Sequence, residues 1–195
     1  MAKNNDIEIR IAGFGGQGII LAGYIIGKAA AIFDNKFSTL IQSFGPEARG
    51  SSCSAQMIIS DSQILYPYLV VPEISIILSR DAYDRFVKEL PANCIMLIEK
   101  DLVIPDKRSD KHKVYAIPAT RLAEEMGRKI VMNIITVGFF SAVTGITSYE
   151  ATRKAVESSV PPGTEEMNIK AFEIGYQYGV ELLKSEPKKT KKKTV

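Results

Sequence analysis

A glycine-rich hexapeptide, Gly-Phe-Gly-Gly-Gln-Gly at residues 13–18, has the residue types and spacing best suited to ligand chemistry. Apolar alternation over residues 7–12 predicts a strand before it, and the apolar residues after Gly18 predict a helix. Glycines at such a turn let a ligand or another chain approach the backbone, because no Cβ stands in the way. The free N–H groups at the start of the following helix form a ready anion site. The candidate contact residues are Gly13, Gly15, Gly16, Gln17 and Gly18.

Two other interpretations of this turn stay open. Gly13, Gly15 and Gly18 satisfy the G-x-G-x-x-G pattern of dinucleotide-binding proteins, which also need an acidic residue at the end of the second strand. Asp34 stands at about the expected count but precedes the second predicted strand, so the NAD interpretation is weak. In the other alternative, the glycines build a tight strand-to-helix turn that binds nothing.

A second loop, polar and glycine-containing, follows the strand predicted over residues 36–42. Arg49 offers a planar donor fork suited to carboxylate or phosphate. Loops after parallel strands emerge at the carboxyl edge of a sheet, so we expect this loop to face the glycine turn. A surface ion pair between Glu47 and Arg49 is the simpler alternative. The candidate residues of this loop are Ser43, Gly45, Pro46, Glu47 and Arg49.

The sequence lacks the residues needed for a metal site, an iron–sulfur centre or nucleophilic catalysis. Cys53 and Cys94 lie far apart in the sequence and form no CxxC motif, so the chain has no ligand cluster for zinc or an iron–sulfur centre. Both thiols are expected in the core. His112 is the only histidine and stands between lysines, and no serine has an evident histidine partner. We therefore expect no catalytic residue and no metal ligand in this chain.

The elements that must position these loops alternate between strand and helix. The pattern predicts an α/β fold: a three-layer, mostly parallel Rossmann-like sheet with helices on both faces. An antiparallel hairpin excursion is expected where residues 63–66 pair back with a strand over 53–60. The other predicted strands cover about 7–12, 36–42, 73–78, 93–98 and 113–117. Helices are predicted over 16–33, 81–90, 120–126 and 133–145, from a capping box at 147–150 to before Pro161, and from about Thr164.

Composition indicates one domain over residues 1–183 and a disordered lysine-rich tail over 184–195. The net charge of +3 comes from the tail, which holds six of the 25 basic residues and one of the 22 acidic ones. The remainder has a slight excess of acidic residues, so we expect no nucleic-acid partner. The N-terminus lacks the apolar core of a secretory signal, and no apolar run could span a bilayer. These features predict a cytoplasmic protein without a membrane partner.

Small residues recur at every fourth position on two of the predicted helices. Gly23, Gly27 and Ala31 form one row, and Ala171, Gly175 and Gly179 form the other. Glycine in a helix costs about 1 kcal/mol relative to alanine, so such rows need a compensating gain. We expect each row to mark a close contact, with the sheet or with another chain.

The two loops together resemble a known family. The segments at residues 13–19 and 42–50 are similar to the gamma subunit of the 2-oxoacid:ferredoxin oxidoreductases, and the likeness continues through residues 64–67, 133–145 and 168–175. The pyruvate and branched-chain members have arginine before the double glycine. Here that residue is Phe14, which resembles the 2-oxoglutarate subunits, as does Gln42 at the start of the second motif. Ser51 stands where a second glycine is usual.

This resemblance implies oxidative decarboxylation of a 2-oxoacid, 2-oxoglutarate to succinyl-CoA, with coenzyme A as acyl acceptor and ferredoxin as electron acceptor. Alternatives are a pyruvate or branched-chain enzyme. The resemblance also implies alpha and beta catalytic subunits and a ferredoxin-like delta subunit, with thiamine diphosphate, magnesium and an iron–sulfur cluster in the assembled complex. The chain has no thiamine motif of the Gly-Asp-Gly type. We expect it to bind no cofactor alone, to be inactive alone, and to use its two loops toward coenzyme A or a partner subunit.

Overall fold

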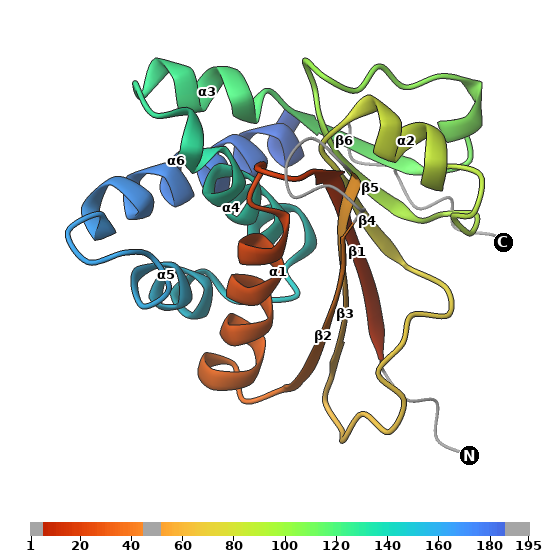
Figure 1. Cartoon of the computed structure of the whole chain (residues 1–195), viewed down its shortest axis with the longest axis horizontal. Coiled ribbons are helices and arrows are strands. Elements are labelled where there is room, and N and C mark those ends of the chain that lie inside the picture. The colour runs from red at the N-terminus through yellow and green to blue at the C-terminus, as the bar shows by residue number, and fades with distance from the viewer. Residues whose placement is uncertain (1–5, 45–51, 186–195) are drawn as a thin grey trace, which may run out of the picture.

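The computed structural model describes residues 6–44 and 52–185. Their strands form one six-stranded sheet in the order β2-β3-β1-β4-β5-β6 (Figure 1). The strands are β1 (Ile7–Phe14), β2 (Phe37–Phe44), β3 (Ser52–Ser60), β4 (Ile74–Ile77), β5 (Ile95–Glu99) and β6 (Lys113–Ile117). The carboxyl ends of β1, β4, β5 and β6 share one edge of the sheet, which we call the carboxyl edge; the opposite one is the amino edge.

One reversed strand makes the sheet mixed. β1, β4, β5 and β6 pair in parallel, whereas β3 runs antiparallel to both of its neighbours, β2 and β1. The predicted α/β class and its antiparallel excursion are therefore confirmed, but the expected hairpin is wrong. Residues 63–66 form no strand, because β3 already pairs with β2 on one side and with β1 on the other. The apolar run that looked like a strand lies instead in the loop between β3 and β4.

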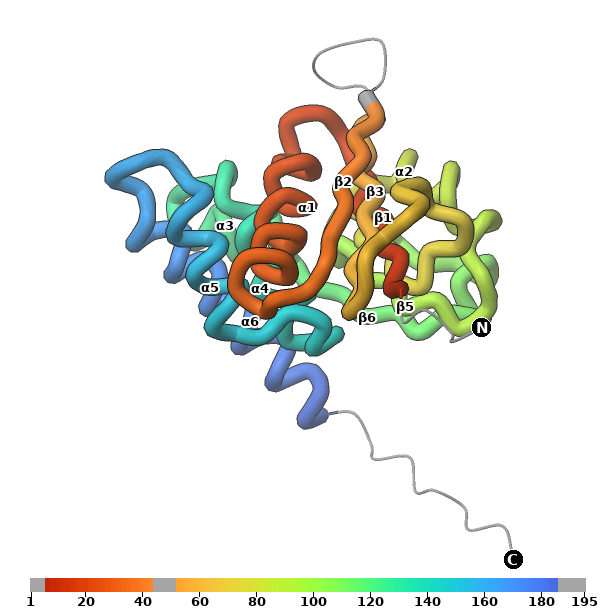
Figure 2. Tube along the Cα trace, turned by 90° about the horizontal axis from the view of Figure 1, so that it is seen from below, coloured from red at the N-terminus to blue at the C-terminus, as the bar shows by residue number. Residues whose placement is uncertain are grey.

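Helices cover the two faces of the sheet unequally (Figure 2). One face carries the larger core, beneath α1 (Ile19–Lys28) with its π-helical extension Ala29–Phe33, and beneath α3, α4, α5 and α6. α2 (Arg80–Phe86) closes a smaller core on the other face, around Ala12, Ile77 and Met96. The remaining α-helices are α3 (Ala119–Glu125), α4 (Met132–Thr144), α5 (Tyr149–Glu157) and α6 (Glu165–Ser185), and short 3-10 helices span Lys107–Ser109 and Lys129–Val131.

The start of one predicted helix needs correction. Ser148, and not Thr147, is the N-cap of α5: its hydroxyl accepts the Ala151 N–H at 3.2 Å. α6 continues through Ser185, two residues past the expected end of the domain. Residues 186–195 of the predicted tail lie outside the described residues.

The two rows of small residues do mark close contacts within the chain. Gly23 faces Leu40 and Ala55 of the sheet, so α1 packs directly on β2 and β3. The second row meets a helix, which the sequence did not predict: a Cβ on Gly175 would overlap the carbonyl group of Ile135 in α4. Gly138 of α4 is placed in the same way against the carbonyl oxygen of Phe172 in α6. The backbones of α4 and α6 therefore touch.

Both cysteines are buried and free, as the sequence predicted. Among the described residues, none of the helices is both long and apolar enough to cross a membrane.

Candidate functional site

The glycine turn connects β1 to α1 at the carboxyl edge and is held by the side chain of Gln17. The Phe14 N–H donates to Gln17 Oε1 at 2.7 Å, and Gln17 Nε2 donates to the Leu78 carbonyl oxygen at 2.8 Å. The Gln17 amide thus ties the end of β1 to the residue after β4. Because both ends of this amide are used inside the chain, Gln17 is a positioning residue for the turn.

Three of the predicted glycines have a structural reason in the turn itself. A Cβ on Gly13 would overlap Gln17 Oε1 and stand 2.9 Å from Ile19 Cδ1. Gly16 and Gly18 have φ of +102° and +70°, a region that side chains other than glycine rarely adopt. Gly18 also lies against the Asn133 amide, whose Nδ2 donates to the Gly18 carbonyl at 3.4 Å. Gly16 is exposed, and nothing in the chain lies within 4 Å of its Cβ position.

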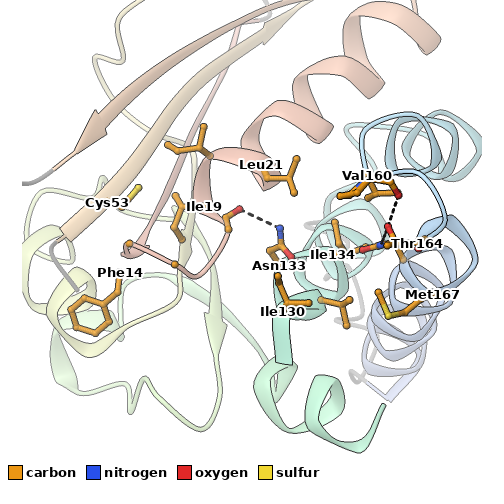
Figure 3. Close-up of a pocket in the computed structure, with 17 residues that line it drawn as sticks. Phe14, Ile19, Leu21, Cys53, Ile130, Asn133, Ile134, Val160, Thr164 and Met167 are labelled. Carbon is orange, nitrogen blue, oxygen red and sulfur yellow. Dashed lines mark hydrogen bonds between the residues drawn. The ribbon is translucent and has the colours of Figure 1, made fainter. Parts of the chain in front are cut away.

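A pocket of about 480 Å³ opens beside the turn. Figure 3 shows Phe14 and Ile19 on one side, Asn133 reaching from α4, and Val160, Thr164 and Met167 on the far side. Its wall includes Gly15, Gly16, Gly18 and Cys53, but not Gly13 or Gln17. Three elements far apart in the sequence therefore meet here: the starts of α1, α4 and α6.

The pocket is neutral, and its polarity comes from helix starts. Among the described residues, no Lys, Arg, His, Asp or Glu lines it. α1 and α4 both begin at this wall without a side-chain cap and without an acidic residue in the first turn. Their first N–H groups give the wall a partial positive charge. Such a wall suits a ligand segment with hydrogen-bond acceptors and an apolar body, and the described part of it offers no cation to pair with a pyrophosphate.

Cys53 lines this pocket beside the turn. Burial raises the pKa of its thiol, so the group is protonated near neutral pH. The site therefore contains no activated thiolate among its described residues.

The second predicted loop is described only at its ends. Ser43 is exposed on β2 and pairs in register with Ser54. Ser52, the first residue of β3, pairs with Phe14, so β3 begins beside the glycine turn at the carboxyl edge. Gly45, Pro46, Glu47 and Arg49 lie outside the described residues, and the predicted approach of the two loops stays a prediction.

Other residues weighed in the sequence lie away from the glycine turn. The Asp34 carboxylate accepts the Ser148 N–H at 2.7 Å and the Ser148 hydroxyl at 2.6 Å, at the start of α5. This bond removes the acidic residue that a dinucleotide site would need. His112 lies just before β6, at the amino edge. Within residues 6–44 and 52–185, no three His, Cys, Asp or Glu side chains form a group able to hold a metal.

Sequence reasoning missed the side of the pocket away from the turn. Asn133, Thr164 and Asn168 supply its polar atoms, from the starts of α4 and α6. Asn133 and Asn168 are both buried, and Asn168 Nδ2 donates to the Thr164 carbonyl at 2.8 Å. The sequence shows only an asparagine at the start of an otherwise apolar helix, with no spacing pattern that marks it as functional.

The fold and the site define a Rossmann-like α/β protein with a glycine turn and a neutral pocket at the carboxyl edge of a mixed sheet. The family described as Pyruvate ferredoxin/flavodoxin oxidoreductase matches residues 8–178. The chain belongs to this family, as a gamma subunit of the multisubunit 2-oxoacid:ferredoxin oxidoreductases. The resemblance seen in the sequence is thereby confirmed.

Three relatives place the chain within the family. It is 46% identical to 2-oxoglutarate synthase subunit KorC of Methanocaldococcus jannaschii, over 90% of this chain and 95% of that one. It is 34% identical to pyruvate synthase subunit PorC of the same organism, over 87% and 95%. The crystal structure of the keto/oxoacid ferredoxin oxidoreductase gamma subunit of Geobacter sulfurreducens PCA superimposes with a TM-score of 0.78 at 37% identity, covering 90% of this chain and 99% of that chain.

Proposed function

We propose that this chain is the gamma subunit of an enzyme that converts 2-oxoglutarate and coenzyme A into succinyl-CoA and CO₂, passing two electrons to ferredoxin. One observation carries the choice of substrate. Within a single organism, the 2-oxoglutarate synthase subunit is 46% identical to this chain and the pyruvate synthase subunit 34%. Phe14 in the turn and Gln42 before the second loop agree with this choice.

The chemistry at the reacting carbon belongs to partner subunits in this proposal. The described residues hold no group able to bind a metal or cluster, so thiamine diphosphate, magnesium and the iron–sulfur cluster would be held by alpha, beta and delta subunits. The gamma chain would complete the coenzyme A side of the site through its two loops. A neutral pocket fits the uncharged pantetheine arm of coenzyme A better than its phosphates, which need cations. Arg49 of the second loop is our candidate for a phosphate.

A substrate panel tests the reaction. We expect the purified complex containing this chain to reduce ferredoxin with 2-oxoglutarate and coenzyme A at least about tenfold more efficiently than with pyruvate or a branched-chain 2-oxoacid, a difference of about 1.4 kcal/mol. The control omits coenzyme A. Preference for pyruvate would contradict the proposed substrate, and turnover by the isolated chain would contradict its role as a subunit.

Two substitutions test the coenzyme A side. Asn133→Leu removes the buried amide from the pocket wall, and Arg49→Ala removes the proposed phosphate contact. We expect each to raise the KM for coenzyme A about tenfold and to leave the KM for the 2-oxoacid within twofold. A normal KM for coenzyme A in both variants of an intact complex would remove the pocket and the second loop from the coenzyme A site.

A further inference from the structure

The loop between β3 and β4 carries an apolar surface at the amino edge, far from the glycine turn (Figure 1). Five large apolar side chains within seven positions point into solvent: Leu65 (85% exposed), Tyr66 (62%), Tyr68 (54%), Val70 (72%) and Val71 (49%). We call residues 64–71 the apolar loop. Its first residues, 64–66, belong to the segment that the sequence predicted as half of a hairpin.

The apolar loop is held in place by polar bonds beneath it. The Glu8 carboxylate in β1 accepts the Val70 N–H at 2.7 Å and the Val71 N–H at 2.6 Å. Glu73 completes the anchor, because its own carboxylate accepts the Glu8 N–H at 3.0 Å. The rings of Tyr66 and Tyr68 lie against each other with centroids 5.4 Å apart. A loop ordered in this way loses little conformational entropy when it binds a partner.

The exposed area of these five side chains is large for a protein surface. With about 150 Å² for each side chain, the lower end of the range for aromatic residues, the exposed fractions amount to about 500 Å². The largest apolar patch of a monomer is about 300–600 Å², and one side of a standard protein interface is about 800 Å². The apolar loop alone therefore supplies most of one side of a specific interface.

Charge identifies the kind of partner. Residues 62–72 contain no charged side chain, whereas the charged groups that anchor or flank them, Glu8, Asp61 and Glu73, are all acidic. A second copy of this chain meeting the loop across a two-fold axis would bring acidic rims together. A different chain with an uncharged, apolar centre and a basic rim is complementary.

We propose that the apolar loop is the docking surface for another subunit of the oxidoreductase, one that presents an apolar centre with a basic rim. The inference rests on the proposed function, since it takes the partner from the same complex. The glycine turn and the docking surface then lie at opposite edges of the sheet, so one partner can hold the chain while the pocket faces the substrates.

The test compares two variants in the full chain. Leu65→Ser/Tyr66→Ser/Val70→Ser removes the centre of the apolar loop, and Ile32→Ser/Ile104→Ser removes two side chains that are 67% and 73% exposed elsewhere. Both variants should melt within a few degrees of the unaltered chain, because exposed side chains add little to stability. The Kd for the purified remainder of the complex, lacking only this chain, is measured by biolayer interferometry.

We expect the loop variant to bind at least about 100-fold more weakly and the control within threefold. Equal binding by the loop variant and the unaltered chain would overturn the docking surface while leaving the proposed function intact. So would a loop variant that loses only a homodimer of this chain. No binding by the unaltered chain would overturn both proposals.

Discussion

Two loops of opposite character lie beside the two ends of β1. At the carboxyl edge the glycine turn is short, and the neutral Gln17 amide fixes it by both donating and accepting. At the amino edge the apolar loop is long, and the Glu8 carboxylate fixes it only by accepting. One loop borders a pocket, and the other presents side chains outward. Both loops are held rigidly by side-chain hydrogen bonds. In the glycine turn the backbone is left to line a cavity, whereas in the apolar loop the side chains are left to form a surface.

We expect the largest effect on stability from a substitution within the glycine turn. Gly13→Val should lower the free energy of unfolding by about 3 kcal/mol, because its side chain would displace Gln17 Oε1 and press on Ile19 and Leu78. Denaturant unfolding of the full chain measures the loss. The control Gly16→Ala meets no atom within 4 Å and should lose only about 1 kcal/mol, from the strain of its positive φ. Equal losses would contradict a packed turn.

Removal of the Gln17 amide should have the next largest effect. Gln17→Leu leaves the Phe14 N–H and the Leu78 carbonyl without their partner, which should cost about 2 kcal/mol in the free energy of unfolding. The same denaturant measurement applies. An unchanged stability would show that these groups find other partners and that Gln17 does not position the turn.

At the amino edge the effect should stay local. Glu8→Leu removes the acceptor of two loop N–H groups and should speed hydrogen exchange at Val70 and Val71 by about tenfold or more. Exchange in β5 should stay unchanged, as measured by mass spectrometry on peptic fragments. If exchange rises equally across the sheet, the anchor supports the whole domain and the two edges are not independent.

The smallest expected effect is a difference in reactivity between the two cysteine thiols, one at each edge of the sheet. Cys53 lines the pocket at the carboxyl edge, and Cys94 stands just before β5 at the amino edge. Burial is the main cause that raises the pKa of Cys94, to about 12, so its thiol stays protonated at pH 8. Cys53 should react with a thiol reagent faster than Cys94, and coenzyme A in the assembled complex should slow Cys53 only. Equal protection of both thiols would contradict a ligand in the pocket.

Much of the fold followed from local patterns. The strand predicted over residues 113–117 has those bounds in the structure, and the turn at 13–18 connects a strand to a helix as expected. The hairpin at 63–66 failed because a pattern cannot show that β3 already has two neighbours. The hydrogen bonds by which Gln17 holds the turn could not be predicted either, because the carbonyl of Leu78 that accepts one of them is 61 positions away in the sequence. Asn133 was missed because a single polar residue at a helix start has no spacing to identify it.

β1 connects the two edges directly. Glu8 and Phe14 are six residues apart on an extended strand, so about 20 Å separates the anchor of the apolar loop from the mouth of the pocket. β1 lies inside the sheet and is hydrogen-bonded to β3 on one side and to β4 on the other. These bonds fix its length and its register. β1 therefore sets a fixed spacing between the proposed docking surface and the pocket, so a subunit bound at one end would hold the pocket at a defined distance.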